Sequence, residues 1–150
     1  MIPVSATPIV IDTNVCLDLF VFRDPRWAEL LGALESGAIK AVTRADCRDE
    51  YLAVLRYPHL PLDDAGRLEA IARFDALLHV VAPDAKHVRL PVCTDRDDQK
   101  FLEIARDAGA SVLITKDKAL LKLGRRTVRE GLFKIMVPEA WLKANAGGLT

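Results

Sequence analysis

Four acidic residues stand at places in the chain where a carboxylate could do chemistry. Asp12 directly follows an apolar, mostly β-branched run at residues 9–11, which is typical of a strand buried on both faces. Asp117 comes just past the end of a second buried strand. Asp98 begins an amphipathic helix in register with its apolar stripe, and Glu50 lies on the flank of such a stripe in another predicted helix. Because parallel strands end at one edge of a sheet, these carboxylates are expected to converge on one cleft.

Converging carboxylates need a cation to offset their mutual repulsion. Like charges at short range repel and each loses hydration, so fold stability alone does not favour such a cluster. A divalent ion resolves the conflict, and hard cations such as Mg²⁺ and Mn²⁺ take carboxylate and water ligands. A carboxylate cluster without His or Cys suits phosphodiester hydrolysis, in which the ion polarises water and stabilises the leaving oxygen.

Each of these acidic residues also has a purely structural interpretation. Asp12 opens a sequence that makes a good strand-to-helix turn with no chemistry in it. Glu50 can be a solvated helix residue. Asp95, Asp97 and Asp98 crowd one helix start, where any of them can serve only as the N-cap. The inward register of Asp98 favours it over its two neighbours as a ligand.

Strand and helix signals alternate along the chain. Strands are predicted at residues 9–11, 38–43, 79–83, 111–115 and 134–137. Helices are predicted at residues 15–22, 25–35 and 44–56, from a cap at Asp63 or Asp64 through residue 78, at 98–108 and 117–123, and from Pro138 onward. Residues 84–94 are expected to be irregular and residues 146–148 frayed. This alternation predicts an α/β fold whose central parallel sheet is covered by helices on both faces.

Composition limits the classes of function. The chain has 150 residues, which we interpret as one domain over residues 1–150. Lys plus Arg and Asp plus Glu both number 21, so a nucleic-acid partner has to be held by a local basic patch. The three cysteines are far apart, which argues against a zinc site and a disulfide framework. No apolar run reaches the roughly 20 residues of a membrane span, and residues 1–4 resemble no signal peptide, so we expect a cytoplasmic protein.

Four short motifs, in order, resemble those of one known family. They are IVIDTNV at residues 9–15, EYLAVL at residues 50–55, DRDDQKFLEIA at residues 95–105 and ITKDKALL at residues 114–121. Together they resemble the PIN-domain nucleases, over nearly the whole chain from about residue 9 to residue 141. The resemblance implies a three-layer α/β/α sandwich with about five parallel strands. It also implies an endoribonuclease dependent on Mg²⁺ or Mn²⁺ that leaves a 5′-phosphate and a 3′-hydroxyl.

The resemblance assigns roles residue by residue. The implied metal ligands and catalytic residues are Asp12, Glu50, Asp98 and Asp117, with Asp95 and Asp97 as candidate auxiliary ligands. Asn14 and Thr115 are expected to support Asp12 and Asp117 through hydrogen bonds. Our hypothesis for RNA binding is that phosphates contact Lys116, Lys118, Arg125 and Arg126, although an ordinary mixed surface is the simpler interpretation of these charges.

The likeness is strongest to VapC-type toxins of bacterial toxin–antitoxin pairs. It implies an RNA substrate, a cognate antitoxin protein and a candidate homodimer as partners. An alternative is a catalytically degenerate module of the same fold that binds RNA or protein without cutting. A phosphatase or receiver-type domain fits less well, because it needs a second acidic residue where this chain has Asn14.

Overall fold

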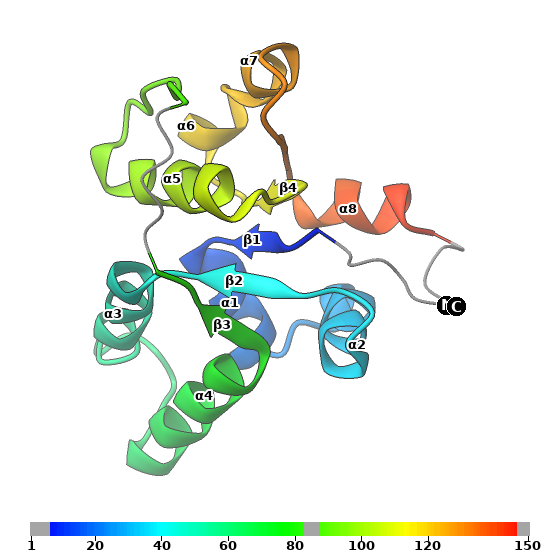
Figure 1. Cartoon of the computed structure of the whole chain (residues 1–150). Coiled ribbons are helices and arrows are strands. Elements are labelled where there is room, and N and C mark those ends of the chain that lie inside the picture. The colour runs from blue at the N-terminus through cyan, green and yellow to red at the C-terminus, as the bar shows by residue number, and fades with distance from the viewer. Residues whose placement is uncertain (1–6, 83–87, 147–150) are drawn as a thin grey trace.

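The protein, described here by a computed structural model over residues 7–82 and 88–146, is built on a five-stranded parallel sheet (Figure 1). The strands are β1 (Ile9–Ile11), β2 (Ala41–Thr43), β3 (Leu78–Val80), β4 (Val112–Ile114) and β5 (Lys134–Met136). Their order across the sheet is β3-β2-β1-β4-β5, and every neighbouring pair is parallel. The central strand β1 therefore has β2 and β3 on one side and β4 and β5 on the other.

Helices connect the strands, and two of them end at a glycine. They are α1 (Thr13–Phe20), α2 (Ala28–Ser36), α3 (Ala45–Val54), α4 (Asp64–Leu77), α5 (Gln99–Ala108), α6 (Lys118–Leu121), α7 (Gly124–Arg129) and α8 (Pro138–Ala144), with the short 3₁₀ helices η1 (Pro25–Trp27) and η2 (Arg96–Asp98). Helices α2 and α5 end at Gly37 and Gly109, whose φ angles of 81° and 66° are left-handed. Residues with a side chain rarely adopt that conformation, so glycine is the natural stop signal.

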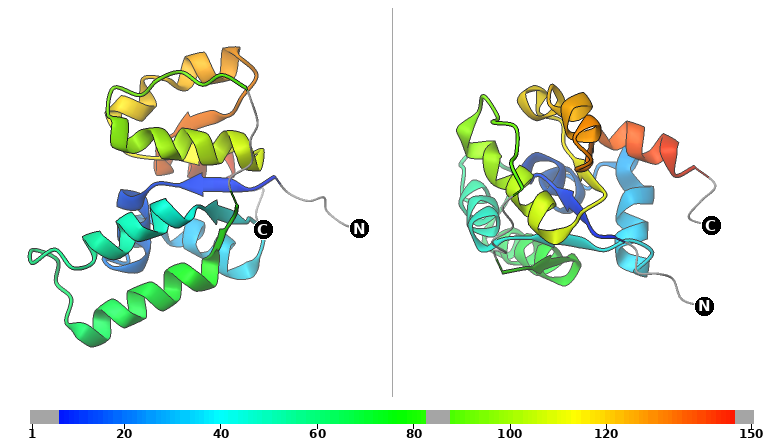
Figure 2. Two further views of the ribbon diagram at one scale, coloured as in Figure 1. Left: turned by 60° about the vertical axis from the view of Figure 1, so that its left-hand side comes forward. Right: turned by 45° about the horizontal axis from the view of Figure 1, so that its top comes forward.

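Alternate residues of the central strand face two helical layers. Ile9 and Ile11 lie in one hydrophobic cluster with residues of α1, α2, α3, α4 and α8. Val10 lies in a second cluster, with residues of α5 and α6. All residues of β1 and β4 are buried, as a parallel sheet covered on both faces requires (Figure 2). The fold is the three-layer α/β/α arrangement that the sequence predicts.

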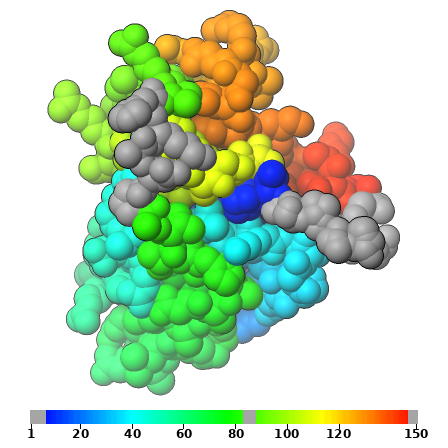
Figure 3. Space-filling view, in the orientation of Figure 1, coloured from blue at the N-terminus to red at the C-terminus, as the bar shows by residue number. Residues whose placement is uncertain are grey.

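The helices next to the two edge strands, β3 and β5, lie at opposite ends of the molecule. Helices α6 and α7 form one end and α4 the other, with the strands between them (Figures 1 and 3). In Figure 1, β1 and β2 run toward the left, so the carboxyl edge of the sheet lies between α3 and α5 on that side. None of the helices in the described part of the chain is long and apolar enough to span a bilayer.

Most predicted elements are confirmed, and the differences have local causes. The strand predicted to begin at residue 79 begins at Leu78, directly where α4 ends. Helix α7 was not predicted, because its sequence GRRTVR buries Thr127 alone and offers no apolar stripe. Residues 88–94 are irregular as predicted. The rest of that segment, the N-terminal residues 1–4 and residues 147–148 of the frayed end lie outside the described residues.

Candidate active site

The carboxyl edge of the sheet brings the first and fourth motifs together. Asp12 is the residue after β1, and Thr115 is the residue after β4, the strand paired with β1. The Asp12 backbone N–H donates to the Ile114 carbonyl over 3.1 Å, so the two segments leave the sheet side by side. The helices that follow pack on opposite faces, α1 in the first hydrophobic cluster and α6 in the second. A crevice opens at such a switch point, and ligands of parallel α/β sheets bind there.

Thr115 ties the two acidic segments to each other. Its hydroxyl donates to Asp12 Oδ2 and accepts a 3.0 Å bond from the Asp117 backbone N–H. Asp12 Oδ1 accepts from the Val15 N–H at 3.1 Å, which caps α1. The supporting hydrogen bonds expected from Thr115 are thus present, through its hydroxyl in both directions. Asn14 is exposed, and no hydrogen bond of its side chain is found within the described part of the chain.

Burial makes the ionised form of the Asp12 carboxyl group unfavourable. The residue is 4% exposed, and this burial raises its pKa from 3.8 to about 6. The hydrogen bonds from Thr115 and Val15 and the charge of Lys116 lower the pKa, whereas the negative charge of Asp117 raises it. Near neutral pH the group is therefore ionised at a free-energy cost, which a bound cation would relieve.

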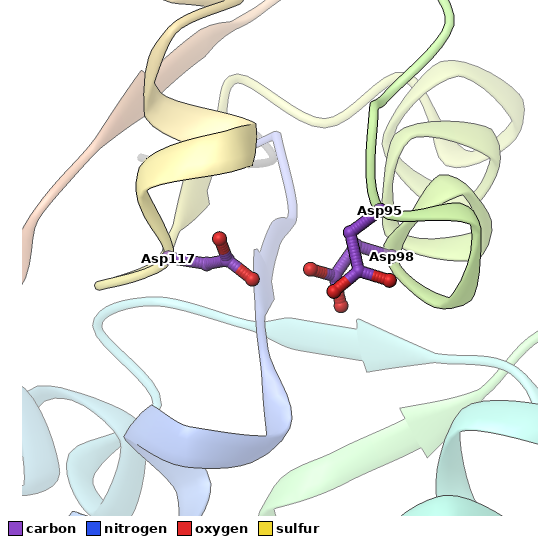
Figure 4. A group of neighbouring side chains, drawn as sticks. All are labelled: Asp95, Asp98 and Asp117. Atoms are coloured by element: carbon purple, nitrogen blue, oxygen red, sulfur yellow. The ribbon is translucent and has the colours of Figure 1, made fainter.

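Three further carboxylates converge beside Asp12. One oxygen from each of Asp95, Asp98 and Asp117 lies within 4.8 Å of the other two. Asp98 comes from η2, Asp95 from its cap, and Asp117 from the segment after β4; their side chains point toward one another (Figure 4). Asp98 Oδ2 is the buried side-chain oxygen that lacks a hydrogen-bond partner among residues 7–82 and 88–146.

The carboxyl groups of this trio shift one another's pKa values. Burial raises the pKa of Asp98 well above its ordinary value, and the neighbouring Asp117, Asp95 and Asp12 raise it further. The pKa of Asp117 is lowered, chiefly because the protonated Asp98 carboxyl stabilises its charge. The opposite shifts of Asp98 and Asp117 mean that ionising both carboxyls together is unfavourable without a cation. An all-oxygen donor set with an unpartnered buried oxygen fits a hard divalent ion such as Mg²⁺ or Mn²⁺.

Glu50, the acidic residue of the second motif, is not a member of that trio. It projects from α3 and is half-buried. Its Oε1 accepts a 2.7 Å bond from Lys100 Nζ, and its Oε2 accepts from the Thr13 hydroxyl. Burial lowers the pKa of Lys100, but the hydrogen bond and charge of Glu50 more than compensate, so the pKa is raised overall. Glu50 therefore lies at the same sheet edge, in contact with a cation supplied by the chain.

Asp97 differs from its two acidic neighbours. It is exposed, as Asp95 is, but it is not part of the converging trio. Its backbone N–H donates to Asp95 Oδ1 at 3.1 Å, so Asp95 caps η2 while its side chain also reaches the trio. The helix-capping alternative considered for this segment therefore applies to Asp95, whereas Asp98 makes no side-chain cap bond.

Two polar residues of the third motif have structural roles that the sequence did not reveal. Lys100 pairs with Glu50 across a sequence separation of 50 residues. Gln99 accepts from the Cys93 N–H at 2.7 Å and donates to the Pro91 carbonyl at 3.1 Å, which anchors the segment leading to η2. A Lys beside several acidic residues is a signal for a nearby carboxylate, but the identity of that partner depends on the tertiary fold.

The four basic residues proposed for RNA contact fall into two groups. Lys116 pairs with Asp18 at 2.6 Å, and Arg126 pairs with Glu130 at 2.9 Å. Lys118 and Arg125 are exposed on α6 and α7 and have no ion pair within the described residues. The second group is thus available to an external anion without first breaking an internal contact.

The comparison with known families agrees with this geometry. The sequence profile described as "PIN domain" matches residues 8–119, more than half of the chain. The chain belongs to the PIN-domain family. The matched region contains β1, the α3 acidic residue and the acidic trio, and the fold of this PIN domain is that of a nuclease family whose members typically bind divalent metal ions. No curated protein matches the chain.

Proposed function

We propose that this PIN domain is a metal-dependent endoribonuclease that hydrolyses RNA phosphodiester bonds with Mg²⁺ or Mn²⁺. The observation that carries the proposal is the convergence of Asp95, Asp98 and Asp117 around a buried Asp98 oxygen that has no hydrogen-bond partner within the described chain. Such an arrangement is unfavourable without a cation, because it concentrates negative charge in a partly desolvated place. The family match supports the same chemistry, since PIN domains are generally nucleases.

Each acidic side chain has a distinct part in this proposal. Asp98 and Asp117 hold the ion, Asp95 is the auxiliary ligand, and Asp12 supplies buried negative charge from the end of β1. Thr115 fixes the Asp12 carboxylate and the Asp117 backbone in one orientation. A divalent ion bound there supplies water activation near neutral pH and stabilisation of the charge on the leaving oxygen.

RNA binding is assigned to the basic face of α6 and α7. Lys118 and Arg125 are exposed and free of ion pairs among the described residues, and α6 begins directly after Asp117. The net charge of the chain is zero, so this local patch supplies the attraction to phosphate. Lys116 and Arg126 join the patch if RNA phosphates replace their internal partners Asp18 and Glu130.

The biological role that we propose is that of a toxin in a toxin–antitoxin pair, acting on RNA in the cytoplasm. It is supported by the motif resemblance to VapC-type toxins. A cognate antitoxin protein and a second copy of the chain are the partners that this role implies. A small DNA-binding protein encoded beside this one would support the assignment.

A cleavage assay tests the enzymatic proposal. The full chain is incubated with structured RNAs in Mn²⁺ and in EDTA, alongside Asp98→Asn and the matched control Asp49→Asn, which removes an exposed acid from α3. We expect Mn²⁺-dependent cleavage by the wild type and by the control, and a loss of at least about 100-fold in Asp98→Asn. RNA binding without cleavage at any ion concentration would favour the degenerate binding module instead.

A further inference from the structure

Lys100 occupies a position that has the donors of a cation site. Its Nζ donates to Glu50 Oε1 over 2.7 Å and also to the Asp97 carbonyl oxygen. The Lys100 side chain is 16% exposed and the Glu50 side chain 30%, so the pair is partly withdrawn from water. The Phe101 ring adds a third contact, with its centroid 5.3 Å from Nζ. A carboxylate oxygen and a main-chain carbonyl are the donors that hard cations prefer.

Both oxygens of Glu50 are already engaged by the protein itself. Oε1 faces Lys100 and Oε2 accepts from the Thr13 hydroxyl. Glu50 is not part of the Asp95, Asp98 and Asp117 group, so the acidic edge of the sheet is divided into two parts. One part has a Lys ammonium against its carboxylate, and the other has a buried oxygen with no partner among residues 7–82 and 88–146.

We propose that Lys100 is a built-in cation that takes the place of a metal ion at Glu50, so that this PIN domain binds a single divalent ion, at Asp98 and Asp117. Glu50 and Lys100 then act by holding α3 and the start of α5 in place, and Glu50 is not a ligand of the ion. The inference rests on the proposed metal-dependent function and specifies its ion count. The physical reason is Coulombic, because a fixed ammonium repels a second divalent ion from the same carboxylate. It also neutralises Glu50 at all times, without depending on the ion concentration.

Mn²⁺ binding to the full chain without RNA tests this inference. Calorimetric titration gives the number of ions and the dissociation constant, and the spectrum of free Mn²⁺ gives an independent count. The variants are Glu50→Gln, Lys100→Met, Lys100→Arg and the double variant with Glu50→Gln and Lys100→Met, with Asp98→Asn as reference. Thermal unfolding of each metal-free variant shows that it is folded.

We expect one ion in the wild type, with an affinity that changes less than about threefold in Glu50→Gln but falls at least about tenfold in Asp98→Asn. Lys100→Met should bind a second ion, because the vacated oxygens of Glu50 and Asp97 become available to it. Lys100→Arg keeps the charge and should bind one ion, and the double variant should also return to one. A residue with only a packing role would not create a second site that depends on Glu50.

The results separate this inference from the proposed function. A wild type that binds no Mn²⁺ overturns both. One ion whose affinity falls about tenfold or more in Glu50→Gln, two ions in the wild type, or a Lys100→Met protein that remains at one ion overturns the Lys100 assignment and leaves the nuclease proposal standing. If Lys100→Met does not fold, the Glu50→Gln titration still decides whether Glu50 is a ligand.

Discussion

Replacing Asp12 by Asn should stabilise the metal-free protein while it abolishes cleavage. Asp12 is 4% exposed, and its pKa is raised from 3.8 to about 6. A rise of about two pKa units corresponds to about 3 kcal/mol against the ionised folded state. The amide of Asn has the same shape and can still accept from the Val15 N–H. The Asn amide nitrogen, which replaces Oδ2, cannot accept the hydrogen bond from the Thr115 hydroxyl, and this loss costs about 1 kcal/mol. The expected net gain is about 2 kcal/mol.

The gain must depend on pH in one direction. The folded-state pKa of Asp12 lies above its unfolded value. Asp12 therefore costs no folding free energy below about pH 4, and the cost grows with pH until it is complete above about pH 6. The penalty is therefore about 3 kcal/mol above pH 7 and about 1.5 kcal/mol near pH 5. Besides burial, which causes the penalty, the hydrogen bonds from Thr115 and Val15 reduce it; of the charged neighbours, Asp117 increases it and Lys116 reduces it.

Urea unfolding in EDTA at pH 7.5 and pH 5 measures this difference. At pH 7.5 Asp12→Asn should gain about 2 kcal/mol, or roughly 4–8 °C in Tm, over the wild type, and the gap should shrink at pH 5. Asp49→Asn, an exposed position on α3, should show no comparable change at either pH. An Asp12→Asn protein that is less stable than the wild type at pH 7.5, or a gap that does not shrink, refutes the claim that the site is strained by its own charge.

Three further outcomes follow from the contacts. Thr115→Val removes the hydroxyl that lowers the Asp12 pKa, so stability should fall by about 1–2 kcal/mol and the pH at which Mn²⁺ begins to stabilise the protein in thermal unfolding should rise. Replacing Lys118 and Arg125 together by Ala should weaken RNA binding and reduce the salt slope of log Kd by about 1.4, measured by filter binding, whereas an unchanged slope excludes them. Leu113→Ala empties a fully buried β4 position and should lose about 2–5 kcal/mol in urea unfolding, so that fold and activity fail together, unlike Asp12→Asn.

The parts of the fold that could be predicted from the sequence are those with a local cause. The apolar runs of β1 and β4 predict buried strands, and each strand ends before a polar residue, Asp12 or Thr115. The proximity of the Asp12 and Asp117 segments follows from strand order, because β1 and β4 are neighbours whose helices leave on opposite faces. Such inferences need only the pattern of the chain and the geometry of parallel sheets.

The parts that could not be predicted depend on contacts between distant residues. The bond from Lys100 to Glu50 joins α5 to α3, and neither residue's local sequence indicates which partner it will meet. Helix α7 has no periodic apolar face, so its formation depends on packing beside β5 and not on its own pattern. Whether Asp95 would cap η2 or approach the other acidic side chains was also open, and the structure shows that it does both.

The two halves of the acidic edge solve the same electrostatic problem by different means. A carboxylate withdrawn from water needs a nearby positive charge or a proton, or it destabilises the fold. At Glu50 the chain provides that charge itself, from the first turn of α5. At Asp98 no ion pair is found among residues 7–82 and 88–146, and burial together with the neighbouring carboxylates raises the pKa of that carboxyl, which favours its protonated form. A proton that binds there must leave before a metal ion can enter, so Mn²⁺ binding to the wild type should release protons and weaken as pH falls. Calorimetry in buffers of different ionisation enthalpy counts those protons, and binding with no proton release near neutral pH would contradict the assignment of the ion to Asp98.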